Sequence, residues 1–487
     1  MKKITVPLFL AFLWLVSLLS GCDGMEDHYS GNPNLRLSFS QDTLSFDTVF
    51  TTIGSATHPL MIYNTNDEPL NIETILLASG GSSGFRINVD GRKGDLFNNI
   101  GIQAKDSMYV FVEVTVDPNE ADQPLLLEDS IVLSVNGIRQ SVLLEAYGQD
   151  VNLYKGGVIL DKDVTFRNER PYLIYDSLVI AKGATLTIDK GTTLHLHDKA
   201  NLVVYGTLKT LGTRQAPVTF RGDRLDFILN DILPYDRTPG QWGGIFFKSE
   251  SFDNQMEHTI VRNGSTGLTF LASTPERLKL TLKDSQITNM KNNLFTAINC
   301  RIEVINSELT NAAGVVAALI GGEYAFTHCT LSNHMTLAKS DSVHVCLALS
   351  NKFSDKQLYP LQVTFANSII EGGSAEEIML SADKGADFAY QFTNSVVKSK
   401  SKIKKDEHFT NSFIVSWTPA FRMLGGEKNK YVYDFRLAAD TVVGVGKANL
   451  DISQKYPVDR LGVDRLTSPK GPTIGAYEFV PWEEDEE

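Results

Sequence analysis

The sequence predicts an all-β protein in which a β-sandwich precedes a solenoid of parallel strands. Residues 35–150 contain short runs with alternating apolar and polar residues, such as MYVFVEV at 108–114, separated by turn signals such as Asn136-Gly137. Residues 177–213 carry pairs of apolar residues about every eight positions. Such short runs bury their apolar faces only when many of them stack, which is the logic of a solenoid.

The N-terminus has the layout of a secretion signal. Lys2 and Lys3 precede an apolar run over residues 4–19, and the run ends in Leu19-Ser20-Gly21-Cys22. This ending resembles the bacterial lipobox, which implies a signal peptide over residues 1–21 and a lipid on Cys22. An ordinary signal peptide with a chance cysteine is the alternative. The lipid chains would anchor the protein in the outer membrane.

Residues 22–34 are polar and predict a flexible tether. The acidic stretch 23–27 (DGMED) resembles the export tag of lipoproteins displayed on the cell surface. A solvated acidic linker explains it as well, and the protein would then stay on the periplasmic face.

The expected sandwich spans residues 35–150. Phe46-Asp47-Thr48-Val49, Asn64 and the closing stretch 144–150 (LEAYGQD) resemble immunoglobulin-like domains of the ASH and choice-of-anchor-D type. The resemblance implies a spacer or docking module.

The expected solenoid spans residues 151–480. Its stretch 177–213, together with Gly206-Thr207-Leu208 and Trp242-Gly243-Gly244-Ile245, resembles the right-handed parallel β-helix of the pectin-lyase-like superfamily. The stretches 459–465 (DRLGVDR) and 474–478 (IGAYE) resemble the closing coil of choice-of-anchor-Q proteins, which implies a cap over the open end. Residues 481–487 predict a solvated acidic tail.

A ten-residue pattern recurs along the solenoid. It contains a polar residue followed by a small one, and these pairs begin at spacings of 22, 22, 39 and 27 residues: Asp284-Ser285, Asn306-Ser307, His328-Cys329, Asn367-Ser368 and Asn394-Ser395. His328-Cys329 therefore occupies a slot held elsewhere by Asn-Ser or Asp-Ser, which favours a structural ladder over metal ligation or thiol chemistry. The spacing of 39 fits one coil with an insertion or nearly two coils.

The net charge and the cysteine content limit which binding partners and which disulfides we expect. The net charge of −13 argues against nucleic acid as a partner. If Cys22 carries lipid, then Cys300, Cys329 and Cys346 remain, and at least one of them is free or pairs with another molecule. We expect no cofactor.

Two histidine-containing stretches are weaker candidates for chemistry than the insertion 221–241. His195 and His197 alternate with Leu194 and Leu196 on a predicted strand, so we expect both imidazoles to face solvent, where they form a weak candidate metal pair. Glu257-His258 coincides with a coil turn, which favours a structural role over an acid–base pair.

The insertion 221–241 is the main candidate ligand site. It is rich in charge and lies beside an aromatic residue, a combination that suits sugar binding; the candidate residues are Asp223, Asp226, Asp231, Asp236, Arg237 and Trp242. Paired carboxylates could also hydrolyse a glycosidic bond. The alternatives are a self-paired surface loop and a tryptophan in the core.

The catalytic motifs of pectate lyases and of glycoside hydrolases with this fold are absent from the sequence, and we predict no catalytic residue. The sequence therefore favours an envelope lipoprotein with a non-enzymatic binding surface for a polysaccharide or an envelope protein. The alternatives are a polysaccharide lyase or glycosidase with an unfamiliar site near 221–258, and an accessory subunit of an outer-membrane assembly.

Overall fold

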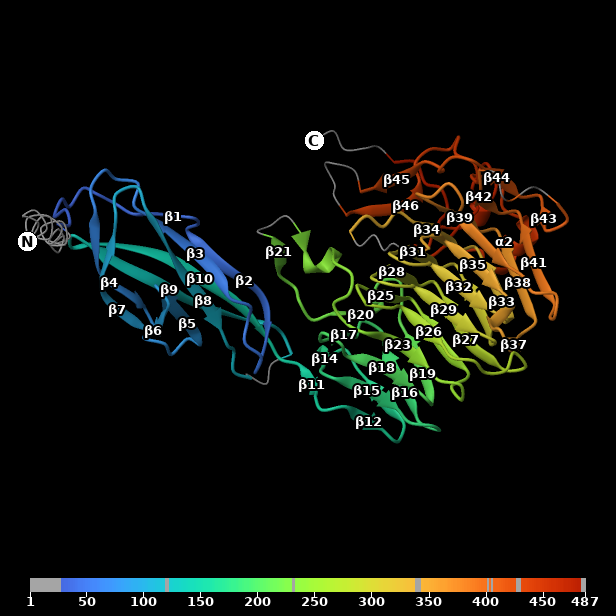
Figure 1. Ribbon diagram of the computed structural model, residues 1–487, viewed down its shortest axis with the longest axis horizontal. Coiled ribbons are helices and arrows are strands. Elements are labelled where there is room, and N and C mark those ends of the chain that lie inside the picture. Colours follow the sequence, from blue (N-terminus) through green and yellow to red (C-terminus); the bar gives the residue numbers. More distant parts are fainter. Residues whose placement is uncertain are drawn as a thin grey trace, which may run out of the picture. The chain divides into compact units, whose positions relative to one another are not determined.

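The computed structural model describes residues 28–118, 122–229, 233–337, 343–400, 403, 406–425 and 431–482. The chain divides into two compact units, with the boundary between Asp150 and Val151. The regular structure of both units consists almost entirely of strands (Figure 1). Among the described residues, no helix is both long and apolar enough to cross a bilayer. The predicted signal peptide, Cys22 and the acidic stretch 23–27 lie outside the described residues, as does the end of the tail after Trp482.

Unit 1 consists of two five-stranded sheets around one core. Sheet A has the order β1 (Ser38–Phe39), β3 (His58–Tyr63), β8 (Ser107–Val114), β5 (Phe85–Val89) and β6 (Arg92–Gly94). Sheet B has the order β2 (Thr43–Phe50), β10 (Ile138–Gln149), β9 (Leu125–Val135), β4 (Leu70–Leu77) and β7 (Leu96–Ile102).

Period-two alternation builds this sandwich, as predicted. In β8, Val110, Val112 and Val114 are buried while their neighbours face outward. The predicted hairpin at Asn136-Gly137 joins β9 to β10, and both residues have positive φ, 50° and 76°, as the tight turn requires. The pairs are antiparallel except β2 with β10, which run parallel.

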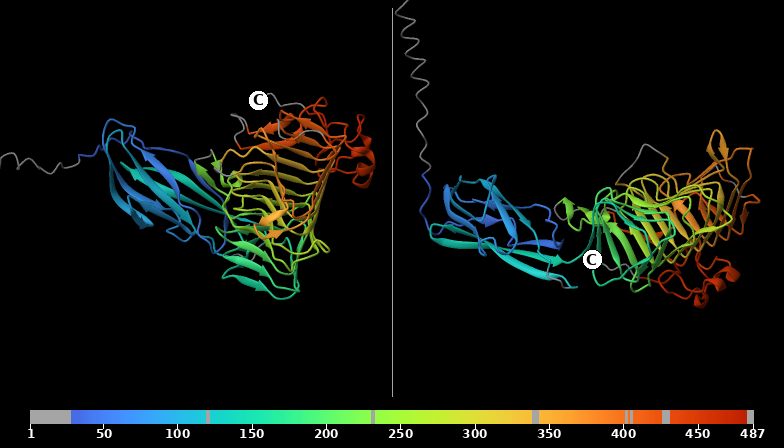
Figure 2. Two further views of the ribbon diagram at one scale, coloured as in Figure 1. Left: turned by 45° about the vertical axis from the view of Figure 1, so that its right-hand side comes forward. Right: turned by 90° about the horizontal axis from the view of Figure 1, so that it is seen from below.

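Unit 2 is a parallel β-helix, and each complete coil contributes one strand to each of three sheets (Figures 1 and 2). Sheet C comprises β11 (Asn152–Tyr154), β14 (Tyr172–Ile174), β17 (Thr193–Leu196), β20 (Val218–Gly222), β25 (Thr259–Arg262), β28 (Gln286–Met290), β31 (Glu308–Ala312), β34 (Thr330–Asn333), β39 (Ile369–Gly372), β42 (Val396–Lys398) and β44 (Phe413–Val415). Sheet D comprises β12 (Val158–Leu160), β15 (Ser177–Ile180), β18 (Asn201–Val204), β23 (Gly244–Phe247), β26 (Leu268–Phe270), β29 (Phe295–Ile298), β32 (Ala317–Ile320), β35 (Leu347–Ser350) and β40 (Ile378–Ser381).

Sheet E comprises β13 (Val164–Phe166), β16 (Thr185–Asp189), β19 (Thr207–Leu211), β24 (Asn254–Glu257), β27 (Leu278–Lys283), β30 (Arg301–Ile305), β33 (Gly322–Thr327), β38 (Leu361–Ala366), β41 (Phe388–Thr393) and β43 (Phe409–Thr410). Short elements complete the unit: β21 (Phe227–Leu229), β22 (Leu233–Pro234), η1 (Tyr235–Arg237), β36 (Lys352–Ser354), β37 (Gln357–Leu358), β45 (Phe421–Leu424), β46 (Tyr433–Leu437), α2 (Leu450–Lys455) and η2 (Arg465–Thr467).

The core of unit 2 is a stack of equivalent side chains. Phenylalanines of successive coils follow one another with ring centroids 4.5 to 6.3 Å apart, namely Phe247, Phe270, Phe295, Phe326, Phe365, Phe392 and Phe409. The spacing of 39 residues is one coil with an insertion, because Thr330 pairs directly with Ile369. The inserted residues include the β36–β37 hairpin.

The polar-small pairs form the predicted ladder at the corner between sheets E and C. The polar member has positive φ, for example 51° at His328 and 47° at Asn306. The small member accepts a hydrogen bond from the coil before it: the Cys329 backbone N–H donates to Ser368 Oγ at 3.1 Å. Cys329 and His328 are fully buried, so the pair is structural. Asn411-Ser412 is a further member that we did not predict.

The C-terminal segment lies along the side of the β-helix (Figure 2). We name residues 443–478 the strap. Ladder residues of four successive coils bind it: Asn394 to Lys447 O (3.1 Å), Asn367 to Asn449 O (3.1 Å), His328 to Ser453 Oγ (3.0 Å) and Asn306 to Val458 O (2.9 Å). Arg214, at the same corner three coils from Asn306, donates to Leu461 O at 3.1 Å. The stretches 459–465 and 474–478, which we expected to cover the open end, therefore belong to a segment that braces the side of the β-helix over several coils.

Candidate functional site

The charged side chains of the predicted loop 221–241 pair with different residues and do not form one cluster. Asp223 lies 2.6 Å from His197 Nδ1, and Asp226 accepts from Arg224 Nε at 2.7 Å. Asp231 lies outside the described residues. The structure therefore does not gather the three described aspartates, Asp223, Asp226 and Asp236, into one site, and part of the described loop is self-paired.

Trp242 is not a platform for a sugar ring. Its side chain is fully buried in the core of unit 2, and its indole N–H donates to the Arg262 carbonyl at 2.9 Å. The prediction of a ligand-binding Trp242 is therefore wrong.

The prediction that both histidines face solvent fails for His195. The pairing of His195 with Arg221 places the next coil's side chain beside it, and His195 is only 6% exposed. Its Nδ1 lies 3.3 Å from the Gly222 carbonyl. Burial, aided by the nearby Arg221 charge, lowers the pKa of His195 to about 3. His197 instead stacks on Tyr175 with ring centroids 4.1 Å apart. Within the described ranges, no three His, Cys, Asp or Glu side chains lie close enough together to hold a metal ion.

Asp236 and Arg237 remain together at a groove on the outer face of sheet C. Asp236 Oδ1 lies 2.8 Å from Arg221 and 2.9 Å from Arg262, so one carboxylate joins two guanidinium groups from adjacent coils. Arg237 lines the same groove, whose volume is about 220 Å³. We name this feature the sheet C groove.

The floor of the sheet C groove repeats from coil to coil. Asn263 directly follows β25, and Asn289 and Asn311 are the last residue but one of β28 and β31; all three have φ between 62° and 66°. Asn289 donates to the Asn263 side-chain oxygen at 2.6 Å, and Asn263 donates to the Asp236 carbonyl at 2.9 Å. This second ladder was missed, although three aligned repeats end in Asn: 280–289, 302–311 and 324–333.

One wall of the sheet C groove is formed by three aromatic residues from the C-terminal part of unit 2, namely Tyr431, Tyr433 and Phe435. The rings of Tyr433 and Phe435 are parallel within 1°, and the Tyr433 hydroxyl donates to the His334 carbonyl at 3.1 Å. The wall is thereby fixed against the β-helix.

Glu308 is the carboxylate at the floor of the groove. One of its oxygens accepts from Gln286 at 2.9 Å and from Thr310 at 2.8 Å, and the other accepts from the Tyr477 hydroxyl. Because it is buried and held by three donors, it serves to position the polar floor.

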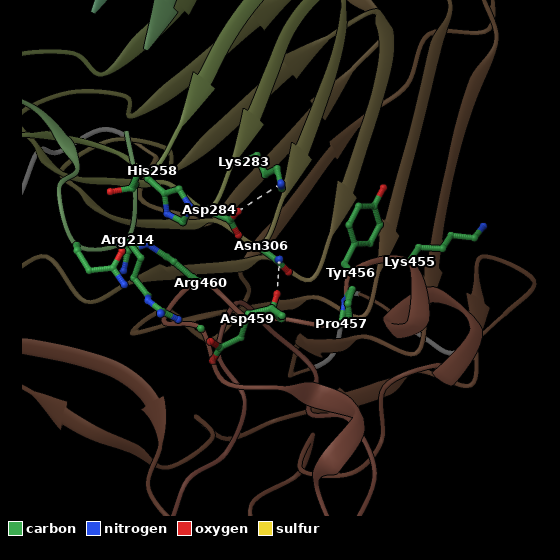
Figure 3. Close-up of a pocket in the computed structure, with 14 residues that line it drawn as sticks. Arg214, His258, Lys283, Asp284, Asn306, Lys455, Tyr456, Pro457, Asp459 and Arg460 are labelled. Atoms are coloured by element: carbon green, nitrogen blue, oxygen red, sulfur yellow. Dashed lines mark hydrogen bonds and ion pairs between the residues drawn. The ribbon is translucent and has the colours of Figure 1, made fainter. Parts of the chain in front are cut away.

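A second and larger cavity lies between the strap and the corner ladder (Figure 3). Its volume is about 450 Å³, and we name it the corner pocket. His258, which the sequence placed at a coil turn, lies here with φ of 41° and its Nε2 3.7 Å from Asp284. Burial lowers the pKa of His258 and raises that of Asp284.

The cysteines of unit 2 are unpaired and buried: Cys300, Cys329 and Cys346. Burial raises the pKa of the Cys300 and Cys329 thiols to about 12, and that of Cys346 well above its ordinary value. They therefore act as small core residues.

The comparisons with known proteins give limited similarity. No family model matches the chain. The curated Protein bark beetle of Drosophila melanogaster is 31% identical over 103 residues, which are 20% of this chain and 3% of that protein. Among solved structures, a family 123 glycoside hydrolase from Clostridium perfringens, whose structure was analysed for glycolipid glycan hydrolysis, is 8% identical to this chain. The match covers 25% of this chain and 30% of the hydrolase chain. Its TM-score of 0.18 marks it as a distant structural match.

Proposed function

We propose that this chain is an envelope lipoprotein, anchored in the outer membrane through Cys22 and displayed at the cell surface, whose β-helix binds a polysaccharide in the sheet C groove without cleaving it. The observation that carries the proposal is the asparagine row Asn263–Asn289–Asn311 beside a fixed aromatic wall. The anchor and the location rest on the sequence motif alone.

The chemistry of the groove suits sugar hydroxyls. Each hydroxyl donates and accepts, and the amides of Gln286 and Asn289 and the hydroxyl of Thr288 offer both kinds of group. Their side chains are partly exposed, whereas Asn263 and Asn311 beneath are buried and hold the row in place. An aromatic wall covers the apolar face of a ring.

The repeat suits a polymer. Because strands of adjacent coils lie roughly 4.8 Å apart, a chain that runs along the solenoid axis crosses one coil after another, and the partly exposed Gln286, Thr288 and Asn289 contact it in the coil of β28. The volume of about 220 Å³ is small, so the groove fits one unit of such a chain at a time.

The way in which the two carboxylates of the groove are held supports binding without cleavage. Asp236 is occupied by Arg221 and Arg262, and Glu308 by its three donors. Both carboxylates therefore hold parts of the groove together and contribute to its shape and charge.

The test is a glycan array with the purified protein, followed by calorimetry on the best ligand. Asn289→Gly removes an amide without backbone strain, because Asn289 already has positive φ. We expect Asn289→Gly and Gln286→Ala each to weaken binding by roughly 2- to 13-fold, the value of one hydrogen bond. Asn411→Gly is the matched control, since Asn411 is an exposed asparagine with φ of 50° outside the groove.

Incubation of the protein with the same polysaccharide measures turnover. New reducing ends or unsaturated products would refute the non-enzymatic proposal and favour a hydrolase or lyase. Absence of both binding and products would refute the glycan proposal and favour an envelope protein as the partner or an accessory role in an assembly.

A further inference from the structure

The corner pocket is built by two parts of unit 2 that are far apart in the sequence. Arg214, His258 and Asp284 come from the β-helix, and Tyr456 and Arg460 come from the strap (Figure 3). Its volume of about 450 Å³ falls within the range of roughly 300–1,000 Å³ that is typical of small-molecule sites.

The lining of the corner pocket carries an excess of positive charge. Four cationic side chains line it, namely Arg214, Lys283, Lys455 and Arg460, against the two carboxylates of Asp284 and Asp459. This excess stands out in a chain of net charge −13. An anion that enters the pocket is therefore attracted locally in spite of the charge of the whole protein.

Asp459 is already engaged, because both of its carboxylate oxygens accept hydrogen bonds from backbone N–H groups of the strap. One oxygen accepts from the Leu461 and Val463 N–H groups at 2.8 Å each, and the other accepts from the Glu478 N–H at 2.7 Å. Asp284 lies 3.7 Å from Lys283. The cationic side chains, foremost Arg460 and Lys283, therefore remain as the main recognition elements.

Arg460 has an unmet hydrogen-bond donor. Its Nε is buried and has no hydrogen-bond partner among the described residues, while its NH1 donates to the Tyr477 hydroxyl at 3.1 Å. An unpartnered buried donor costs about 1–3 kcal/mol, which an incoming acceptor can recover. Arg214, by contrast, is held by the Leu461 carbonyl at 3.1 Å.

We propose that the corner pocket is a second binding site, which takes an oxyanion group, a carboxylate, sulfate or phosphate, of a small ligand or of a glycan substituent. Arg460 and Lys283 bind the anionic oxygens, and Lys455 adds charge at the rim. His258 offers a hydrogen bond to a neighbouring hydroxyl. The proposal goes beyond the sheet C groove and does not depend on it.

Titration calorimetry at low salt tests the site, with sodium phosphate, sodium sulfate, glucuronate and neutral glucose as probes. We expect the anions to bind and glucose not to bind. Binding of phosphate and sulfate would point to a tetrahedral anion, and binding of glucuronate to a carboxylated sugar. Either result supports the site, whereas equal binding of glucose, or no anion binding at about 10 mM, overturns it.

Variants separate this pocket from general charge. Lys283→Gln and Lys455→Gln should each weaken anion binding by about 2- to 5-fold, and Arg460→Gln by more. Lys182→Gln, an exposed lysine elsewhere on unit 2, makes the same change in net charge and should have no effect. An equal loss with Lys182→Gln overturns the proposal. Tryptophan fluorescence checks that Arg460→Gln is folded, and the two lysine variants keep the test valid if it is not.

The two proposed sites can fail separately. Asn289→Gly should leave anion binding unchanged, and Lys283→Gln should leave polysaccharide binding in the sheet C groove unchanged. A loss of both kinds of binding in either variant would contradict the assignment of two independent sites.

Discussion

Removal of one hydroxyl from the corner ladder should destabilise the β-helix measurably. Ser368 Oγ accepts the Cys329 N–H at 3.1 Å and donates to the Ala366 carbonyl at 2.9 Å, with all of Ser368 buried. In Ser368→Ala, the Ala366 carbonyl keeps the His328 N–H as a partner. The Cys329 N–H is left without an acceptor, and we therefore expect a loss of about 1–3 kcal/mol in the free energy of unfolding.

Urea unfolding followed by tryptophan fluorescence measures this loss. The described tryptophans all lie in unit 2, so the signal reports the β-helix and not the sandwich. The exposed Ser354→Ala serves as the control and should change the free energy by no more than about 0.5 kcal/mol. Ser368→Cys introduces the residue that the ladder has at position 329, and its loss in the free energy of unfolding should lie between those of Ser368→Ala and Ser354→Ala. A cost for Ser368→Ala no larger than that of Ser354→Ala would refute the ladder argument.

Three further predictions concern the corrected or buried residues. Because the pKa of buried His195 falls to about 3, only the unfolded state takes up a proton at this imidazole between pH 6.5 and 4.5. The free energy of unfolding should therefore fall by about 2–3 kcal/mol over this range. The decline should be shallower in His195→Gln, as measured by unfolding at several pH values. Trp242→Ala should cost about 3–5 kcal/mol in thermal unfolding followed by circular dichroism, whereas normal stability with lost glycan binding would restore its role as a platform. In native protein at pH 8, iodoacetamide should not label Cys300, Cys329 or Cys346, and should label them in urea; rapid native labelling, detected by mass spectrometry, would contradict their burial.

The repeat explains why so much of the fold was predictable. The polar-small pairs recur because every coil makes the same corner, so His328-Cys329 could be assigned from Asn306-Ser307 and Asn367-Ser368. The alternation in β8 predicted a sandwich strand in the same way. In both cases the constraint is local, since it acts within one turn or one strand.

The candidate site was less predictable because it depends on neighbours from other coils. His195 alternates like an exposed residue, yet Arg221 of the next coil covers it. Trp242 follows a charged loop in the sequence, yet it packs into the core beneath. Asp236 and Arg237 do reach a groove, but its floor comes from Asn289 and other residues outside the predicted loop.

The sequence by itself determined that unit 1 is a sandwich, that unit 2 is a β-helix, and that the polar-small pairs form its corner. These features follow from periodicity, which fixes the face of each side chain. Only the tertiary structure decided that residues 443–478 brace the side of the β-helix, because the bonds from Asn306, Asn367 and Asn394 to this strap span long separations in the sequence. The corner pocket exists for the same reason: its two walls meet only after the strap has packed against the coils.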